Sequence, residues 1–181
     1  VLFAGEVGMD AIVSDIRGAV ELLRGLEFKE KTPVVIMSPG EAGKSADRLM
    51  QLYGPGEEQL QKYNAVWSFL GMIPEGYDLG DSMLGFYRQR TRAFFDPDES
   101  RIVVSEGVRT PGWHTPLILK TMETLQVGET EFVLAHELGY ALIAANHDII
   151  GRIASGGMDG DKRLAALALL HGDAVLITME Y

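Results

Sequence analysis

The stretch from Glu131 to Asp148 contains an almost unbroken run of apolar residues after its N-terminal carboxylate. Gly128 or Thr130 can cap the start of a helix here, and the carboxylates of Glu129 and Glu131 favour its positive N-terminal end. The pattern predicts a buried helix from Glu131 to Asp148. We expect the rest of the chain to pack around it.

Other stretches carry apolar residues at spacings of three and four, which is typical of amphipathic helices. They are Met9 to Gly25, Glu57 to Gly71 and a last helix that Asp159 or Asp161 can cap. The capping sequence Ser38-Pro39-Gly40-Glu41 predicts a further helix from Pro39 to about Tyr53, and Leu79 to Arg90 is weakly helical because it contains two glycines. In the stretch from Glu57 to Gly71, we expect Trp67 and Phe69 to pack in the core, because aromatic residues at helical spacing usually do. The glycine-rich stretch from Asp148 to Gly160 is expected to be a connection without an element of its own.

Short apolar runs bounded by turn residues predict three strands. They lie within Pro33 to Ser38, Thr91 to Phe95 and Arg101 to Ser105. Pro97 and its acidic neighbours separate the last two runs and favour a tight turn, so these runs should form a hairpin. Helices together with a small sheet indicate an α+β fold.

The composition indicates the number of domains and argues against some classes of partner. The chain has 181 residues, 46% of them hydrophobic, which predicts one domain over residues 1–181. The net charge of −10 argues against nucleic acid or an anionic membrane as a partner, because both need a positive patch. No run reaches the ~20 apolar residues of a transmembrane helix. Since there is no cysteine, disulfides, thiolate metal sites and cysteine nucleophiles are excluded.

The buried helix contains half of a zinc-binding motif. In H-E-x-x-H, two histidines one helical turn apart bind the metal and the glutamate activates its water. His136 and Glu137 match the first half, but Tyr140 occupies the place of the second histidine. The scaffold of a metal site is therefore present with one ligand changed.

Four segments, in order and spread over most of the chain, resemble a bacterial family of predicted zincin-type metallopeptidases related to the gluzincins. The family runs from Leu-Arg-Gly-Leu through a Gly-Phe-Tyr-Asp-Pro hairpin to Ala-His-Glu-Leu-x-His-Ala-Leu and Glu-Gly-Asp-Ala. The corresponding segments here are Leu23-Arg24-Gly25-Leu26, Ala93-Phe94-Phe95-Asp96-Pro97, Ala135-His136-Glu137-Leu138-Gly139-Tyr140-Ala141-Leu142 and His171-Gly172-Asp173-Ala174.

The resemblance implies a zincin-like fold with a central active-site helix, a small sheet or hairpin, and a downstream ligand-bearing helix. It implies zinc as cofactor, with His136 as the first ligand and Glu137 as the general base. Tyr140 stands at the second ligand position, and His171 stands where the family has a glutamate ligand. Peptide or protein as the partner also follows from the resemblance. An extracytoplasmic location (secreted, periplasmic or lipid-anchored) is expected from the resemblance and from the start at Val1 rather than Met.

Two hypotheses follow. In the first, favoured because two ligands are altered, the domain is weakly active or inactive and binds a peptide or protein along a strand edge. His136, Glu137, Tyr140 and His171 would then satisfy one another by hydrogen bonds. In the second, His136, His171 and possibly Tyr140 bind zinc in an active peptidase with Glu137 as base. Both require the two imidazoles to lie within ~8 Å.

Three further expectations concern the surroundings of this cluster. The hairpin should lie beside Glu137 with one strand edge available to a peptide. Asp173 should orient His171 or cap a local turn. His114, next to Trp113, is expected to be a surface loop residue, with a ligand to the same metal as the alternative.

Overall fold

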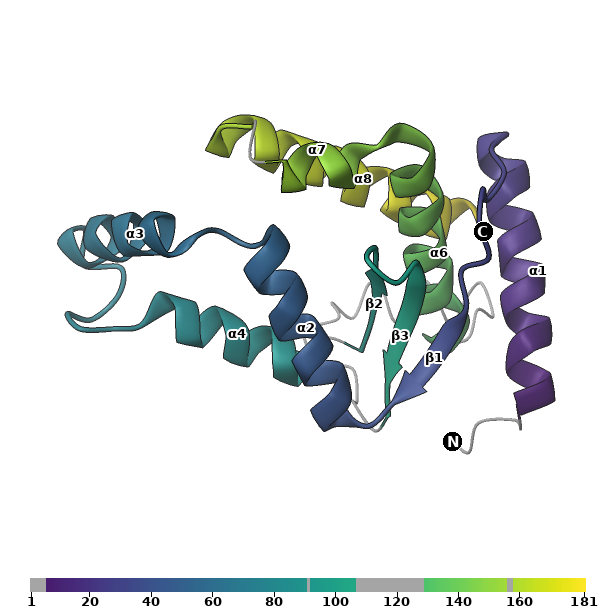
Figure 1. Cartoon of the computed structure of the whole chain (residues 1–181), viewed down its shortest axis with the longest axis horizontal. Helices are drawn as coiled ribbons and strands as arrows, with labels where there is room; N and C mark the ends of the chain where they lie inside the picture. The colour runs from purple at the N-terminus through teal and green to yellow at the C-terminus, as the bar shows by residue number, and fades with distance from the viewer. Residues whose placement is uncertain (1–5, 91, 107–128, 156–157) are drawn as a thin grey trace. The chain divides into compact units, whose positions relative to one another are not determined.

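The structure, a computed structural model, describes residues 6–90, 92–106, 129–155 and 158–181. It is an α+β protein with helices and a small three-stranded mixed sheet (Figure 1), which confirms the predicted class. The chain divides into two compact units, which are described separately. Single-domain organisation over residues 1–181 stays a prediction.

The first unit is built around helix α6 (Glu129–His147), which packs against α1 (Glu6–Arg24) and α8 (Gly160–Glu180). Leu134, Leu138 and Leu142 lie four residues apart on α6 and are at most 1% exposed. Such spacing places them on one face of the helix. The expected buried central helix is confirmed, and the segment that carries His171 packs on it as predicted.

Helices α6 and α8 approach closely at Gly139. A Cβ atom built at this glycine would lie 2.9 Å from Cδ1 and 3.2 Å from Cγ2 of Ile177. Ile177 is itself fully buried. The absence of a side chain at position 139 therefore sets the distance between the two helices.

The sheet has the order β1-β3-β2, with strands β1 (Val34–Met37), β2 (Ala93–Asp96) and β3 (Arg101–Ser105). β2 and β3 form the predicted antiparallel hairpin, with Phe95 opposite Ile102. β1 joins β3 in parallel, because the Ile102 N–H donates to the Pro33 carbonyl and, four residues further on both strands, the Glu106 N–H donates to the Met37 carbonyl. β2 is therefore an edge strand.

The second unit contains α2 (Pro39–Tyr53), α3 (Glu57–Phe69) and α4 (Leu79–Arg90), each close to its predicted range. Helix α3 packs on α4, but none of its described residues is buried. Our expectation that Trp67 and Phe69 lie in the core is wrong, because they are 38% and 89% exposed. Trp67 instead stacks on Tyr63, with ring centroids 6.3 Å apart.

One predicted connection contains a helix. Between Asp148 and Gly160 the structure has α7 (Ile149–Ala154), so the expectation of no element there is wrong. Asp148 adopts a left-handed conformation (φ 48°) that separates α7 from α6. Ile149, Ile150 and Ile153 supply an apolar side, and Ile153 is 5% exposed. The burial of these isoleucines stabilises the helix more than the neighbouring glycines destabilise it.

The predicted loop with Trp113 and His114, and the segment from Pro116 to Leu125, lie outside the described residues. Within the part of the chain that is described, no helix has the length and apolar character needed to cross a bilayer. The last predicted helix is confirmed as α8, and the Asp159 side chain caps it by accepting a 2.9 Å bond from the Lys162 N–H.

Replacing Gly139 by alanine tests the close approach of α6 and α8. Alanine favours helix by up to ~1 kcal/mol, but the clash with Ile177 should cost about 1–3 kcal/mol. We expect a net loss of stability of up to about 2 kcal/mol in urea unfolding. Gly18→Ala in α1 is the matched control, since nothing lies within 4 Å of a Cβ there and it should stabilise by about 0.5–1 kcal/mol. Equal effects of both substitutions would contradict this account.

Candidate functional site

The candidate site consists of His136, Glu137 and Tyr140 of α6 and His171 of α8. These four side chains meet beside strand β2, within the first unit. The ring centroids of His136 and His171 are 6.0 Å apart, and those of Tyr140 and His171 are 4.9 Å apart. The prediction that His171 faces His136 at less than ~8 Å is confirmed. Phe95 of β2 adds an aromatic ring 6.2 Å from that of Tyr140.

Glu137 connects the helix to the sheet. Its carboxylate oxygen Oε2 accepts a 2.9 Å hydrogen bond from the backbone N–H of Phe95. Burial raises the pKa of Glu137 to about 8, although the bond from Phe95 acts in the opposite direction. At neutral pH this carboxyl group is therefore mostly protonated.

Both imidazoles are neutral at neutral pH. Burial lowers the pKa of His136 to about 4, and the neighbouring His171 contributes in the same direction. Burial also lowers the pKa of His171, although much of this residue remains at the surface. A neutral imidazole keeps one nitrogen lone pair, which can accept a hydrogen bond or bind a metal.

His136, His171 and Tyr140 supply only part of the ligand set that a zinc ion needs. Catalytic zinc usually takes three protein ligands at ~2.0–2.2 Å, which puts the ring centres of two bound imidazoles roughly 5 Å apart. His136 and His171, at 6.0 Å, are close to that separation. The third donor would be the phenol of Tyr140, which is normally protonated below pH ~10. The described residues contain no group of three His, Cys, Asp or Glu side chains arranged to hold a metal. The assignment of His136, His171 and Tyr140 as ligands stays a prediction.

The outer edge of β2 faces this cluster. The Ser105 N–H donates to the Arg92 carbonyl, so residues 92, 94 and 96 direct their backbone groups towards β3. Ala93 and Phe95 alternate with them and direct their N–H and C=O groups away from β3. The bond from Phe95 to Glu137 lies on this outer side. The prediction that the hairpin lies beside Glu137 is confirmed.

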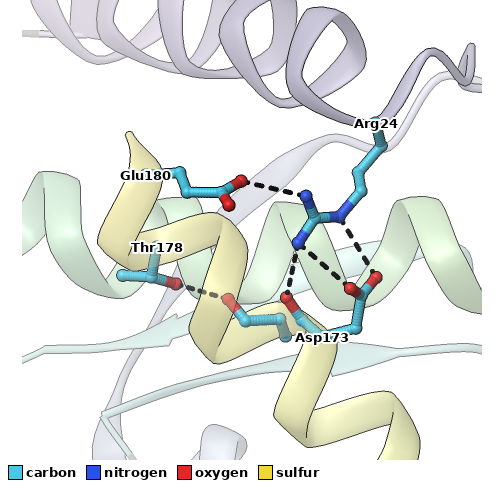
Figure 2. A network of polar contacts seen from close by, with 5 residues as sticks. Arg24, Asp173, Thr178 and Glu180 are labelled. Carbon is cyan, nitrogen blue, oxygen red and sulfur yellow. Dashed lines mark hydrogen bonds and ion pairs between the residues drawn. The ribbon is translucent and has the colours of Figure 1, made fainter.

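Asp173 has a different role from the one expected. Its carboxylate lies 3.0 Å from Nη2 of Arg24, and Nη1 of Arg24 lies 3.0 Å from Glu180 (Figure 2). The guanidinium also donates to the Asp173 carbonyl at 3.4 Å. Instead of orienting His171, Asp173 ties the end of α1 to α8 two residues beyond it.

Sequence reasoning missed Arg24 and the backbone of Phe95 as parts of this region. A signal existed for both, because the segments Leu23-Arg24-Gly25-Leu26 and Ala93-Phe94-Phe95-Asp96-Pro97 carry the family resemblance together with the helix motif. No single residue pattern linked them to His171 or Glu137. The links are contacts between residues distant in the sequence.

A pocket in the second unit is a weaker candidate. Its lining includes Asn64 and Ser68 of α3 and Tyr77 and Asp78 of the loop before α4. Asp78 accepts a 2.9 Å bond from the Asp81 N–H and so stabilises the start of α4, while Asn64 accepts a 3.2 Å bond from the Leu79 N–H. These polar groups have structural partners, so the cluster around His136 remains the candidate site.

Comparisons with protein-family models, with curated proteins and with solved structures find no match to this chain. The resemblance to zincin-type peptidases therefore rests on the four sequence segments. The fold family, the activity and the zinc cofactor are hypotheses.

The protonation of Glu137 predicts a specific pH dependence of stability. The pKa rises from 4.5 to about 8 on folding, so this contribution is full below pH 4.5 and is lost as pH rises to about 8. The lowered pKa of His136 has the opposite effect, because its contribution to the stability of the protein is lost as pH falls from 6.5 to about 4. Between pH 6.5 and 8 the Glu137 effect exceeds the remaining opposite effect of the histidines, and the unfolding free energy should fall by about 1 kcal/mol.

Urea unfolding at pH 6.5 and pH 8.0 measures this loss. Glu137→Gln is the matched variant, because the amide oxygen can still accept the Phe95 N–H but does not titrate. We expect the variant to lack the loss. The same decrease in both proteins would show that another group causes it.

Proposed function

We propose that this chain is a zincin-like domain with little or no peptidase activity, which binds an extended peptide or protein segment along the outer edge of β2. The observation that carries the proposal is the bond between the Phe95 N–H and Glu137. It marks the outer backbone groups of β2 as lying beside the helix motif that such peptidases use for catalysis. A segment at this edge would contact Glu137.

Backbone pairing supports a peptide as the ligand. An extended chain gains affinity by adding as a strand to an exposed sheet edge, and side-chain pockets give specificity. The N–H and C=O groups of Ala93, a residue that is 8% exposed, and the C=O of Phe95 point away from β3 and would supply this pairing. The Phe95 ring and the Tyr140 ring, 6.2 Å apart, supply an apolar surface next to it.

The chemistry of the cluster supports weak or absent catalysis. When bound, zinc supplies a Lewis acid and lowers the pKa of its water. Here a phenol replaces one imidazole ligand, and His171 replaces the carboxylate ligand of the family pattern. Burial keeps Glu137 mostly protonated at neutral pH, and a protonated carboxyl group cannot act as a general base. These three properties all lower the expected rate.

The second candidate function is an active zinc-dependent peptidase. The approach of the His136 and His171 rings to 6.0 Å, with Tyr140 adjacent, favours it. In that case the two histidines and Tyr140 would hold the metal, and Glu137 would be the general base. Bound zinc would also lower the pKa of a nearby carboxyl group.

Fluorescein-labelled casein, an unfolded protein, tests binding and cleavage together. We expect it to bind the chain, measured by fluorescence anisotropy, and to remain intact on a gel after prolonged incubation with added zinc. Ala93→Pro removes an outward N–H from the edge and should raise the Kd at least tenfold, provided that circular dichroism shows the variant to be folded, because Ala93 is 8% exposed. Ala93→Ser keeps the N–H and serves as the control.

Two results would count against this proposal. Equal affinity of Ala93→Pro and the native chain for casein would remove β2 as the binding edge. Turnover of casein that Glu137→Ala abolishes would establish the active peptidase instead.

A further inference from the structure

Helix α8 has a second apolar side that faces solvent. One side packs in the core through its buried residues, which are Leu170, Ala174, Ile177 and Thr178. The other side carries large apolar side chains whose exposed fractions lie between 46% and 68%. These are Leu164, Leu169, Val175, Leu176 and Met179.

Helical geometry gathers the exposed residues on one continuous surface. At ~100° per residue, eight positions fall within a sector of about 140°. We call this sector the outer face of α8, and it consists of Leu164, Ala165, Ala168, Leu169, Gly172, Val175, Leu176 and Met179. Asp161, in the first turn of α8, falls in the same sector, but no residue of the face from Leu164 to Met179 is charged. A helix that is apolar on both sides is normally buried on both sides, which indicates a partner for this face.

The arrangement of sizes on the outer face is self-complementary. Its first half contains the large Leu164 and Leu169 together with the small Ala165 and Ala168, whereas its second half carries only larger residues, at Val175, Leu176 and Met179. If two copies pair antiparallel about a twofold axis at Gly172, Ala168 lies opposite Leu176 and Ala165 opposite Met179. Gly172 itself has nothing within 4 Å of an added Cβ, so the centre of the face is open.

The charged residues Lys162 and Glu180, at the edge of the outer face, are compatible with the same twofold axis. Lys162 and Glu180 are 18 residues apart (162 to 180), which is five turns of 3.6 residues, so both lie along the same rim of the face. Their side chains are 71% and 51% exposed, although each already pairs within the chain, with Asp159 and Arg24. A twofold axis near the middle brings Lys162 of one copy to Glu180 of the other. A parallel arrangement would place the charged rims of the two copies on opposite sides of the interface, so that Lys162 and Glu180 would not meet.

We propose that two copies of this chain associate through the outer face of α8, packed antiparallel about a twofold axis near Gly172. The face spans 16 residues, or ~24 Å, and a helix is ~10–12 Å wide, so the footprint is roughly 250 Å² per copy. Two copies give about 500 Å², below the ~1,000 Å² typical of a stable interface. We therefore expect the dimer to be weak and reversible.

Sedimentation velocity between 1 and 500 µM tests association of the native chain. We expect the weight-average mass to rise from monomer towards dimer over this range. Leu176→Glu should shift the midpoint at least tenfold to higher concentration. Leu22→Glu is the matched control, because Leu22 is 84% exposed on α1 and lies outside the face, and it should leave the midpoint unchanged.

Single cysteines test the direction of pairing, since the native chain has none. In the antiparallel dimer Gly172→Cys should form a disulfide-linked dimer on mild oxidation. Leu164→Cys should not, because the two sulfurs would be ~24 Å apart (8 residues from the axis on each side at 1.5 Å). Equal cross-linking of both variants would overturn the antiparallel arrangement.

Two further results would overturn the proposal as a whole. The first is a native chain that stays monomeric up to 500 µM. The second is a monomer that sediments with phosphatidylcholine vesicles and loses this property in Leu176→Glu, which would make a lipid surface the partner of the outer face. Neither result depends on zinc or on peptide binding.

Discussion

The close approach of α6 and α8 is the constraint on which the site depends. Because position 139 is glycine, Ile177 of α8 can lie directly against the backbone of α6. On the same helices, and within two turns of this contact, the rings of His136 and His171 then come within 6.0 Å. Arg24 adds a second restraint by joining the end of α1 to Asp173 of α8. A wider separation of the helices would leave His136 and His171 as unrelated surface and core residues.

Desolvation decides the chemical state of the residues brought together. Burial keeps Glu137 protonated and His136 uncharged near neutral pH, so the site holds polar groups with little net charge. This state is less costly to bury than ionised groups would be. It also leaves the Glu137 side chain as a hydrogen-bonding partner for the edge of β2, where Phe95 already donates to it. The same burial that stabilises the cluster thus disfavours a base that must be ionised to work.

Much of the fold could be predicted from local patterns, while several contacts could not. The almost unbroken apolar run after Glu131, with its N-terminal capping residues, predicted α6, and the family resemblance predicted that His171 would face His136. The pair Arg24 and Asp173 is separated by 149 residues and has no local signal. The apolar positions of α3 predicted a helix, but periodicity does not reveal whether another element covers Phe69. Likewise, glycine content suggested a loop where Ile153 gains enough burial to form α7.

The central claim is that these helices retain the geometry of a metal site without its full ligand set. The most direct test is the zinc content of the purified chain, compared with that of the double variant Tyr140→His, His171→Glu, which restores the ligand types of the family pattern. Elemental analysis after dialysis against equal free zinc should give well under one zinc per native chain and close to one per double variant. One zinc per native chain, lost in His171→Ala, would show that two imidazoles and a phenol form a complete site and would contradict the account.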